Sequence, residues 1–242
     1  MHTRHLVPEL MDDPELDIAE HQLALAGLRL INQWSGTAKR IAAEINALIK
    51  MRKLKHCRIL DLGCGSGDIA CDVASRIANH HPISVTGWDF SETAVAQATA
   101  NRDRRLAPTK HACEVRFECR NALDTSLAAQ KPRPFDIVYC SLFLHHFTDG
   151  QSLELLARMA SLAEHALVVD DLIRSRRGWL LAQSGCRLLS RSPIVHFDGP
   201  QSVRAAFTIS EIREIAADAG LHPISVRRCW PMRFLLRWER TE

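Results

Sequence analysis

The sequence predicts an α/β protein whose core is a doubly wound sheet, and two observations carry this prediction. Apolar segments of strand length alternate along the chain with amphipathic helical patterns, as in a succession of β–α units. The first unit, residues 57–62 followed by a helical pattern from Asp68, is joined by a turn with glycines at three alternate positions. A strand, a glycine turn and a helix in this order bring a nucleotide-like ligand against bare backbone.

The other elements follow in order along the chain. Residues 81–88 predict a second strand that stops at Asp89, and Ser91 is the expected cap of the next helix. The remaining strands are predicted at residues 113–119, 135–140, 166–171, 223–230 and 232–238. The remaining helices are predicted at residues 16–33, 37–51, 92–101, 178–189 and 209–219. Residues 1–16 are expected to be irregular, and residues 190–207, with two prolines and a glycine, to form a loop.

Composition favours one compact enzyme. The chain has 242 residues with 46% hydrophobic and 24% charged content, and no apolar run approaches the length of a membrane span. The N-terminus lacks a secretory signal, and the eight cysteines form no Cys-x-x-Cys pair, so we expect reduced thiols, no metal site and a cytoplasmic protein. A net charge of +3 is too small to indicate nucleic-acid binding.

The glycine turn narrows the class of ligand. Gly63, Gly65 and Gly67 follow the pattern Gly-x-Gly-x-Gly, whereas dinucleotide folds use Gly-x-Gly-x-x-Gly around a pyrophosphate. Asp61 and Asp68 flank the turn, and their carboxylates would repel a pyrophosphate but attract a cationic ligand. A nicotinamide oxidoreductase is the alternative, and titration with NADH would test it.

Residues 59–68 resemble motif I of the class I S-adenosylmethionine (SAM)-dependent methyltransferases, whose cofactor carries a sulfonium and an ammonium group. The resemblance covers roughly residues 50–240. It implies a Rossmann-like sheet of seven strands in the order 3-2-1-4-5-7-6, with the last strand antiparallel. It also implies an N-terminal helical cap (residues 1–50) and a SAM-binding core (residues 51–242), with an acceptor-pocket insertion at about residues 174–207.

Several residues are expected to bind the cofactor. Asp89, 22 residues after Gly67, is placed to accept the ribose hydroxyls, and Phe90 to cover one face of the adenine. Relatives often carry Asp-Ala after the third strand, where this chain has Asn121-Ala122, and the amide oxygen can still accept from the adenine amino group. The full predicted set is Asp61, Gly63, Cys64, Gly65, Gly67, Asp89, Phe90, Asn121, Ala122 and Ser141.

A Leu-His-His segment after the fourth strand supplies candidate catalytic groups. His145 or His146 is the expected general base, and Asp171, at the end of the fifth strand, would orient the imidazole. Many small-molecule methyltransferases carry such a segment, including those of ubiquinone and menaquinone biosynthesis and natural-product tailoring enzymes. The alternative is that the histidines only cap a helix or fill the loop.

The resemblance therefore implies methyl transfer from SAM to a small acceptor. The hydrophobic helix at residues 178–189 favours an apolar or aromatic acceptor, with O-methylation of a phenol or quinol first. Methylation of carbon or nitrogen is the next alternative, and a SAM-binding regulatory protein without catalysis is another. We expect no nucleic-acid partner and no stable membrane insertion; the oligomeric state stays open.

Overall fold

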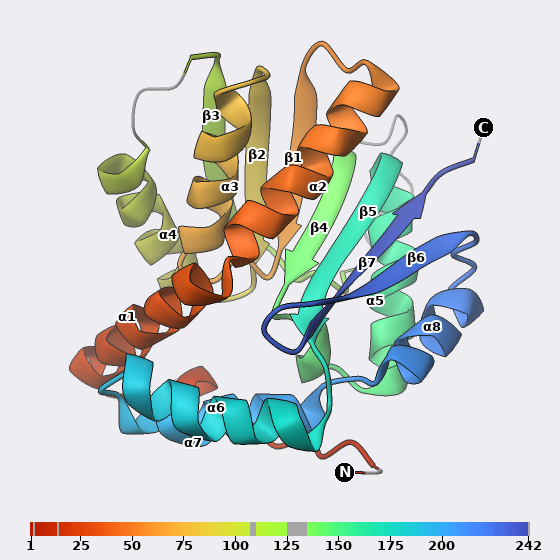
Figure 1. Cartoon of the computed structure of the whole chain (residues 1–242). Helices are drawn as coiled ribbons and strands as arrows, with labels where there is room; N and C mark the ends of the chain where they lie inside the picture. Colours follow the sequence, from red (N-terminus) through yellow and green to blue (C-terminus); the bar gives the residue numbers. More distant parts are fainter. Residues whose placement is uncertain (2, 14, 107–109, 125–134, 242) are drawn as a thin grey trace.

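A seven-stranded sheet forms the centre of the protein, as seen in a computed structural model that describes all residues except 2, 14, 107–109, 125–134 and 242. The strand order is β3-β2-β1-β4-β5-β7-β6, and β7 runs antiparallel to both of its neighbours (Figure 1). This confirms the predicted fold class and strand order. The strands are β1 (Cys57–Leu62), β2 (Ile83–Asp89), β3 (Cys113–Cys119), β4 (Phe135–Ser141), β5 (Ala163–Leu172), β6 (Ile224–Cys229) and β7 (Arg233–Glu239).

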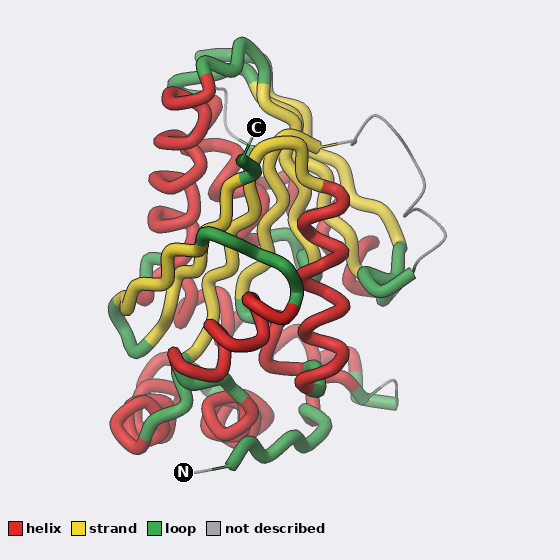
Figure 2. The backbone as a smooth tube through the Cα atoms, turned by 90° about the vertical axis from the view of Figure 1, so that its right-hand side faces the viewer, coloured by secondary structure: helices red, strands yellow, loops and turns green. Residues whose placement is uncertain are grey.

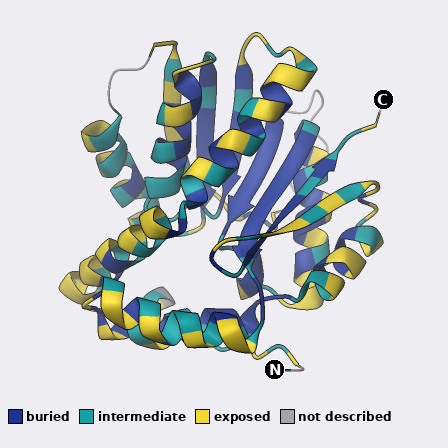
Figure 3. Ribbon diagram, viewed as in Figure 1, coloured by how far each residue is buried: buried dark blue, intermediate teal, exposed yellow. Residues whose placement is uncertain are grey.

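Helices cover both faces of the sheet (Figures 1 and 2). One face carries α2 (Thr37–Arg52), α3 (Asp68–Ala78) and α4 (Glu92–Arg105), and the other carries α5 (Asp149–Leu162) and α8 (Ile209–Asp218). Two hydrophobic clusters, one on each face, fill the space between the layers. The central strands are therefore buried on both sides (Figure 3), which explains why they read as continuous apolar runs in the sequence.

Local signals account for where helices begin. A capping box starts α8, because the Thr208 hydroxyl accepts from the Glu211 N–H and the Glu211 carboxylate accepts from the Thr208 N–H. A second capping box, between Thr148 and Gln151, starts α5, a helix that the sequence analysis did not predict. Such caps satisfy backbone donors that the first turn of a helix leaves free.

A lid of helices lies across the carboxyl ends of the strands (Figure 1). It consists of α1 (Ile18–Ser35), α6 (Arg176–Leu189) and α7 (Pro193–Ala205), with the short 3₁₀ helix η1 (Leu10–Asp12) packed on α7. A small core of its own, formed by Ala24, Cys186, Ile194 and Val195, holds the lid together. By contrast, α2 packs into the hydrophobic cluster of the sheet. The division of the chain at residue 50 stays a prediction.

The loop predicted for residues 190–207 is wrong, because most of that segment forms α7. The residues that suggested a loop have other roles. Pro193 stands in the first turn of α7, where its missing N–H is not needed, and Ser192 caps the helix. Gly199 allows close packing, because a Cβ there would overlap the Cys186 side chain of α6. Among the described residues, no helix has the length and apolar content needed to cross a membrane.

Candidate active site

A cavity of about 1080 Å³ lies between the lid and the carboxyl ends of the strands. Its walls come from the glycine turn after β1, the ends of β2, β4 and β5, the start of β7, and the helices of the lid. Ligand pockets commonly measure about 300–1,000 Å³, so this cavity has room for a cofactor and a second small molecule. Carboxyl-end crevices of this kind are where doubly wound sheets bind ligands.

The glycine turn forms the cavity wall beside β1. Gly63, Gly65 and Gly67 have φ angles of 70°, 51° and 71°, in the left-handed region that favours glycine. A Cβ on Gly63 would overlap the Phe143 ring, whereas a Cβ on Gly65 would meet no atom within 4 Å. Gly65 therefore presents bare backbone to open space in the cavity. A side chain at this position would fill that space.

Asp89 ties the end of β2 to this turn. One carboxylate oxygen accepts from the Gly65 N–H at 2.9 Å, and the other accepts from the Ser91 N–H at 3.0 Å. Each oxygen keeps a second lone pair, so the carboxylate can still accept hydroxyl groups of a ligand. Phe90 lines the cavity beside it and is 72% exposed, as an open stacking surface requires.

Most of the predicted cofactor residues meet at this cavity, and two lie behind it. Those in the wall are Gly63, Cys64, Gly65, Asp89, Phe90, Asn121, Ala122 and Ser141. Gly67 instead packs against Phe117 and Ala98. Asp61 is buried, and its Oδ1 atom has no hydrogen-bond partner among the described residues. Burial and the nearby charge of Asp89 raise the pKa of Asp61 to about 8.

The predicted catalytic residues lie together, and the two histidines line the cavity. His145 and His146 belong to the short helix η3 (Leu144–His146) after β4, and Asp171 stands near the end of β5. The distance from His145 Nδ1 to Asp171 Oδ1 is 2.7 Å, and Asp171 Oδ2 accepts from the His145 backbone N–H at 3.2 Å. Asp171 therefore fixes both the ring and the backbone of His145; the catalytic roles stay predictions.

Glu9 completes this group and was not identified in the sequence analysis. Its Oε1 atom lies 3.7 Å from His145 Nε2, so the imidazole stands between two carboxylates. The Ser202 hydroxyl of α7 donates to the same carboxylate. Glu9, His145 and His146 offer ligand atoms within 4.8 Å of one another, a spacing that a divalent ion can bridge, and the expectation of no metal stays a prediction.

The two histidines have opposite electrostatic surroundings. Burial disfavours the charged form of His145, but Asp171 and Glu9 outweigh it and raise the pKa of His145 to about 10. The ring of His146 faces the cavity and stacks on His145, with ring centroids 4.4 Å apart. His146 is exposed at the cavity wall, where desolvation and the charge of His145 lower the pKa of His146 to about 4. At neutral pH His145 is a cation and His146 is able to accept a proton.

Comparisons with known proteins indicate a methyltransferase domain. A family model described as a methyltransferase domain matches residues 59–165. The ubiquinone biosynthesis O-methyltransferase of Bordetella pertussis is 30% identical over 178 residues, which cover 70% of this chain and 64% of that protein. The enzyme of the same name from Idiomarina loihiensis is 30% identical over 124 residues, covering 51% and 46%. The chain thus spans about half to two thirds of the length of these relatives.

Solved structures show the same fold. Magnesium protoporphyrin IX methyltransferase from Synechocystis, with bound S-adenosylhomocysteine (SAH), superposes with a TM-score of 0.57 at 19% identity, covering 95% of this chain and 90% of that one. A plantazolicin methyltransferase with bound SAH gives 0.61 at 16% identity, covering 89% of each chain. The fold and the glycine turn resemble those of the class I SAM-dependent methyltransferases, and residues 59–165 match a methyltransferase domain. The open Gly65 backbone and the Asp89 carboxylate fit SAM as the cofactor.

Proposed function

We propose that this protein transfers a methyl group from SAM to the oxygen of a small phenol or quinol. The observation that carries the proposal is the ordered pair of His145 and Asp171, which holds His146 against a cavity large enough for both reactants. The relatives named as ubiquinone biosynthesis O-methyltransferases support an aromatic acceptor of this kind.

The residues of the glycine turn and of β2 would hold the cofactor. Gly65 allows the ligand to approach the backbone, Asp89 accepts its ribose hydroxyls, and Phe90 covers its adenine. When bound, SAM supplies the electrophilic methyl group. The protein contributes position and electrostatics, because a displacement at carbon depends on bringing the two reactants into line.

The acceptor must become more nucleophilic before it reacts. A phenol has a pKa near 10, so ionising it at pH 7 costs about 4 kcal/mol. His146 lines the cavity in its neutral form and would take the proton from the acceptor hydroxyl. A pKa of about 4 makes it a weak base, so this transfer depends on the nearby His145 cation stabilising the phenolate that forms. His145 cannot serve as the base while it is protonated, so it acts as a positioning residue, stacked under His146 and held by Asp171.

The lid would exclude water from this reaction. Arg4 ties the N-terminal segment down by donating to the Ala205 and Phe147 carbonyls, at 2.7 and 2.8 Å, and by lying 3.6 Å over the Phe207 ring. Glu9, the residue just before η1, thereby reaches the cavity wall. A closed cavity strengthens the electrostatic interactions within it, because water no longer screens them.

The test is transfer of label from methyl-labelled SAM to a panel of phenols, quinols, thiols and amines. We expect label in the oxygen-methylated product of at least one phenol or quinol. Tight SAM binding with no label transferred to any acceptor would contradict the proposal and favour a regulatory SAM-binding protein. Label found only in amines or on ring carbon would show that oxygen is not the methylated atom.

A further inference from the structure

A buried arginine in the cavity wall keeps a donor without a partner among the described residues. Arg233 stands at the start of β7, lines the cavity and is 2% exposed. Its Nη1 atom lies 3.3 Å from Asp170 Oδ1, and its Nε atom has no hydrogen-bond partner among the described residues. A guanidinium carries five N–H donors. The long contact with Asp170 therefore uses only one of the N–H donors of Arg233.

Asp170 is already neutralised by another arginine. Arg40 of α2 binds it through two hydrogen bonds, with Nε 2.5 Å from Oδ2 and Nη2 2.9 Å from Oδ1. Asp171, the next residue of β5, is engaged by His145 on the other side. Two guanidinium groups thus share the single carboxylate of Asp170. Asp171 also favours the Arg233 charge, but donors of the Arg233 guanidinium stay unused, and an acceptor group of a ligand would satisfy them.

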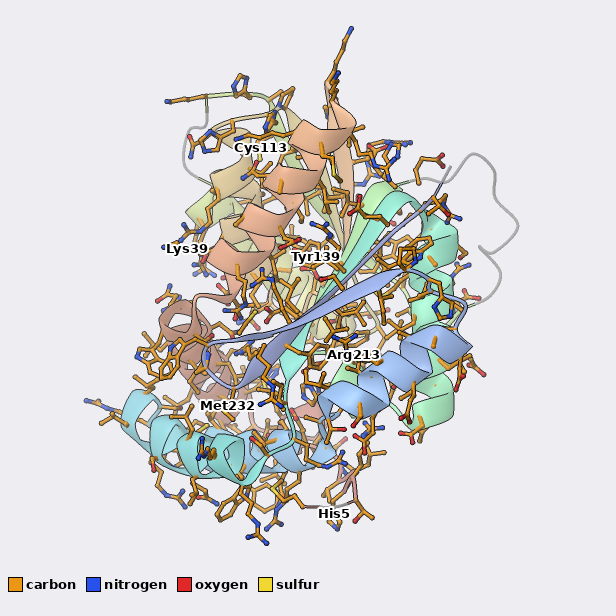
Figure 4. The ribbon with its side chains drawn as sticks, turned by 45° about the vertical axis from the view of Figure 1, so that its right-hand side comes forward. His5, Lys39, Cys113, Tyr139, Arg213 and Met232 are labelled. Atoms are coloured by element: carbon orange, nitrogen blue, oxygen red, sulfur yellow. The ribbon has the colours of Figure 1, made fainter. Side chains whose placement is uncertain are left out.

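The place of Arg233 in the sheet puts it on the acceptor side of the cavity. The cofactor turn follows β1, the histidines follow β4, and β7 lies two strands beyond β4 on the opposite side from β1 (Figure 1). Two strand spacings are about 10 Å, so β7 and β4 are about this far apart across the sheet. Met232, the preceding residue, lies at the end of the sheet that faces the lid (Figure 4), close to Gly178 of α6.

We propose that Arg233 binds a carboxylate of the acceptor, which makes the acceptor an aromatic carboxylic acid with its reacting hydroxyl across the ring. The planar guanidinium fork matches a carboxylate through paired hydrogen bonds, and its single charge balances a monoanion better than a phosphate dianion. The identity of the reacting hydroxyl rests on the proposed function, whereas the carboxylate site does not.

Calorimetry on SAH-loaded protein tests this site with two probes of equal shape, 4-hydroxybenzoate and the neutral 4-hydroxybenzamide. We expect the wild-type protein to bind the acid about tenfold or more tightly than the amide, as charged hydrogen bonds of this kind provide. Arg233→Met should abolish the preference and leave amide binding unchanged. Arg177→Met, on the exposed side of α6, should keep it.

Several results would overturn the proposal. These are equal affinity of the wild-type protein for acid and amide, no binding of the acid at millimolar concentration, or a preference that survives in Arg233→Met. Arg233→Met should melt no lower than wild type, because Arg40 still pairs with Asp170; if it fails to fold, Arg233→Gln gives the same comparison. Carboxylate preference without methyl transfer to any phenol would leave this site standing and remove the proposed function.

Discussion

The carboxylate of Asp89 accepts the backbone N–H of Gly65 at 2.9 Å, which joins the end of β2 to the glycine turn after β1. This contact places an acceptor group beside bare backbone at the position where the fold binds the ribose of its cofactor. The same residue therefore shapes the turn and keeps lone pairs that a ligand hydroxyl can use.

Asp89→Ala should weaken SAM binding at least tenfold, because it removes the ribose acceptor and frees the Gly65 N–H. Isothermal calorimetry with SAH measures this directly. Asp103→Ala, which removes an exposed carboxylate of α4, serves as the control and should bind normally. An unchanged dissociation constant for Asp89→Ala would show that the ribose assignment is wrong.

Gly65→Ala should abolish cofactor binding with only a modest loss of stability. The alanine methyl would occupy open space in the cavity wall, and its left-handed backbone would cost about 1–2 kcal/mol. Gly150→Ala is the matched control, since it also meets no atom within 4 Å but has no left-handed backbone. Comparable SAH affinity in both variants would mean that the ligand does not lie against Gly65.

The histidine pair predicts an unusual pH dependence of methyl transfer. Since the base form of His146 is required and its pKa is lowered to about 4, activity should persist well below the pH at which an ordinary histidine is protonated, near 6.5. The measurement is kcat/KM against pH, with each sample assayed again after return to neutral pH. A loss of activity with an apparent pKa near 6.5 would contradict the assignment.

Substitution of the histidines separates the base from the positioning residue. His146→Ala should lower kcat by about 100-fold or more at saturating SAM, as loss of a general base does. His145→Ala should also slow turnover, because the stacked support of His146 and the Asp171 contact are lost. If neither variant slows the reaction, the acid–base role fails and positioning alone must account for the rate.

The raised pKa of Asp61 predicts how the free energy of unfolding changes with pH. Its pKa is raised to about 8 in the folded protein, whereas an unfolded aspartate titrates near 3.9, so unfolding releases a proton between these values. Stability should therefore fall as pH rises from about 4 to about 8 and show no further loss from this group above that range. Thermal melts of ligand-free wild type and Asp61→Asn measure this contribution, and equal slopes in the two proteins would exclude it.

Local sequence patterns predicted well the strands and the turn that position the site. Buried strands show as apolar runs, and left-handed turns as glycines, so the strands and the glycine turn were accessible from the sequence, whereas the strand order came from the resemblance to the methyltransferase family. His145 and Asp171 could be paired because they follow neighbouring strands. The position of Asp61 behind the cavity wall could not be predicted, because burial at a strand end depends on how the next turn folds over it.

Contacts distant in sequence were missed. Glu9 lies 136 residues before His145, in a segment with no periodic pattern, and only the docking of the N-terminal segment on α7 brings the two together. The prediction of a loop in place of α7 failed for a related reason. Gly199 serves close packing on Cys186, and that packing is a tertiary contact that residue type alone does not reveal.

The central claim is that SAM binds in the turn between β1 and α3, and a crystal structure with SAH tests it most directly. We predict density for the nucleoside against Gly65, with both ribose oxygens within hydrogen-bond distance of the Asp89 carboxylate and the sulfur toward His146. An empty turn, or a nucleoside bound elsewhere in the cavity, would contradict the account.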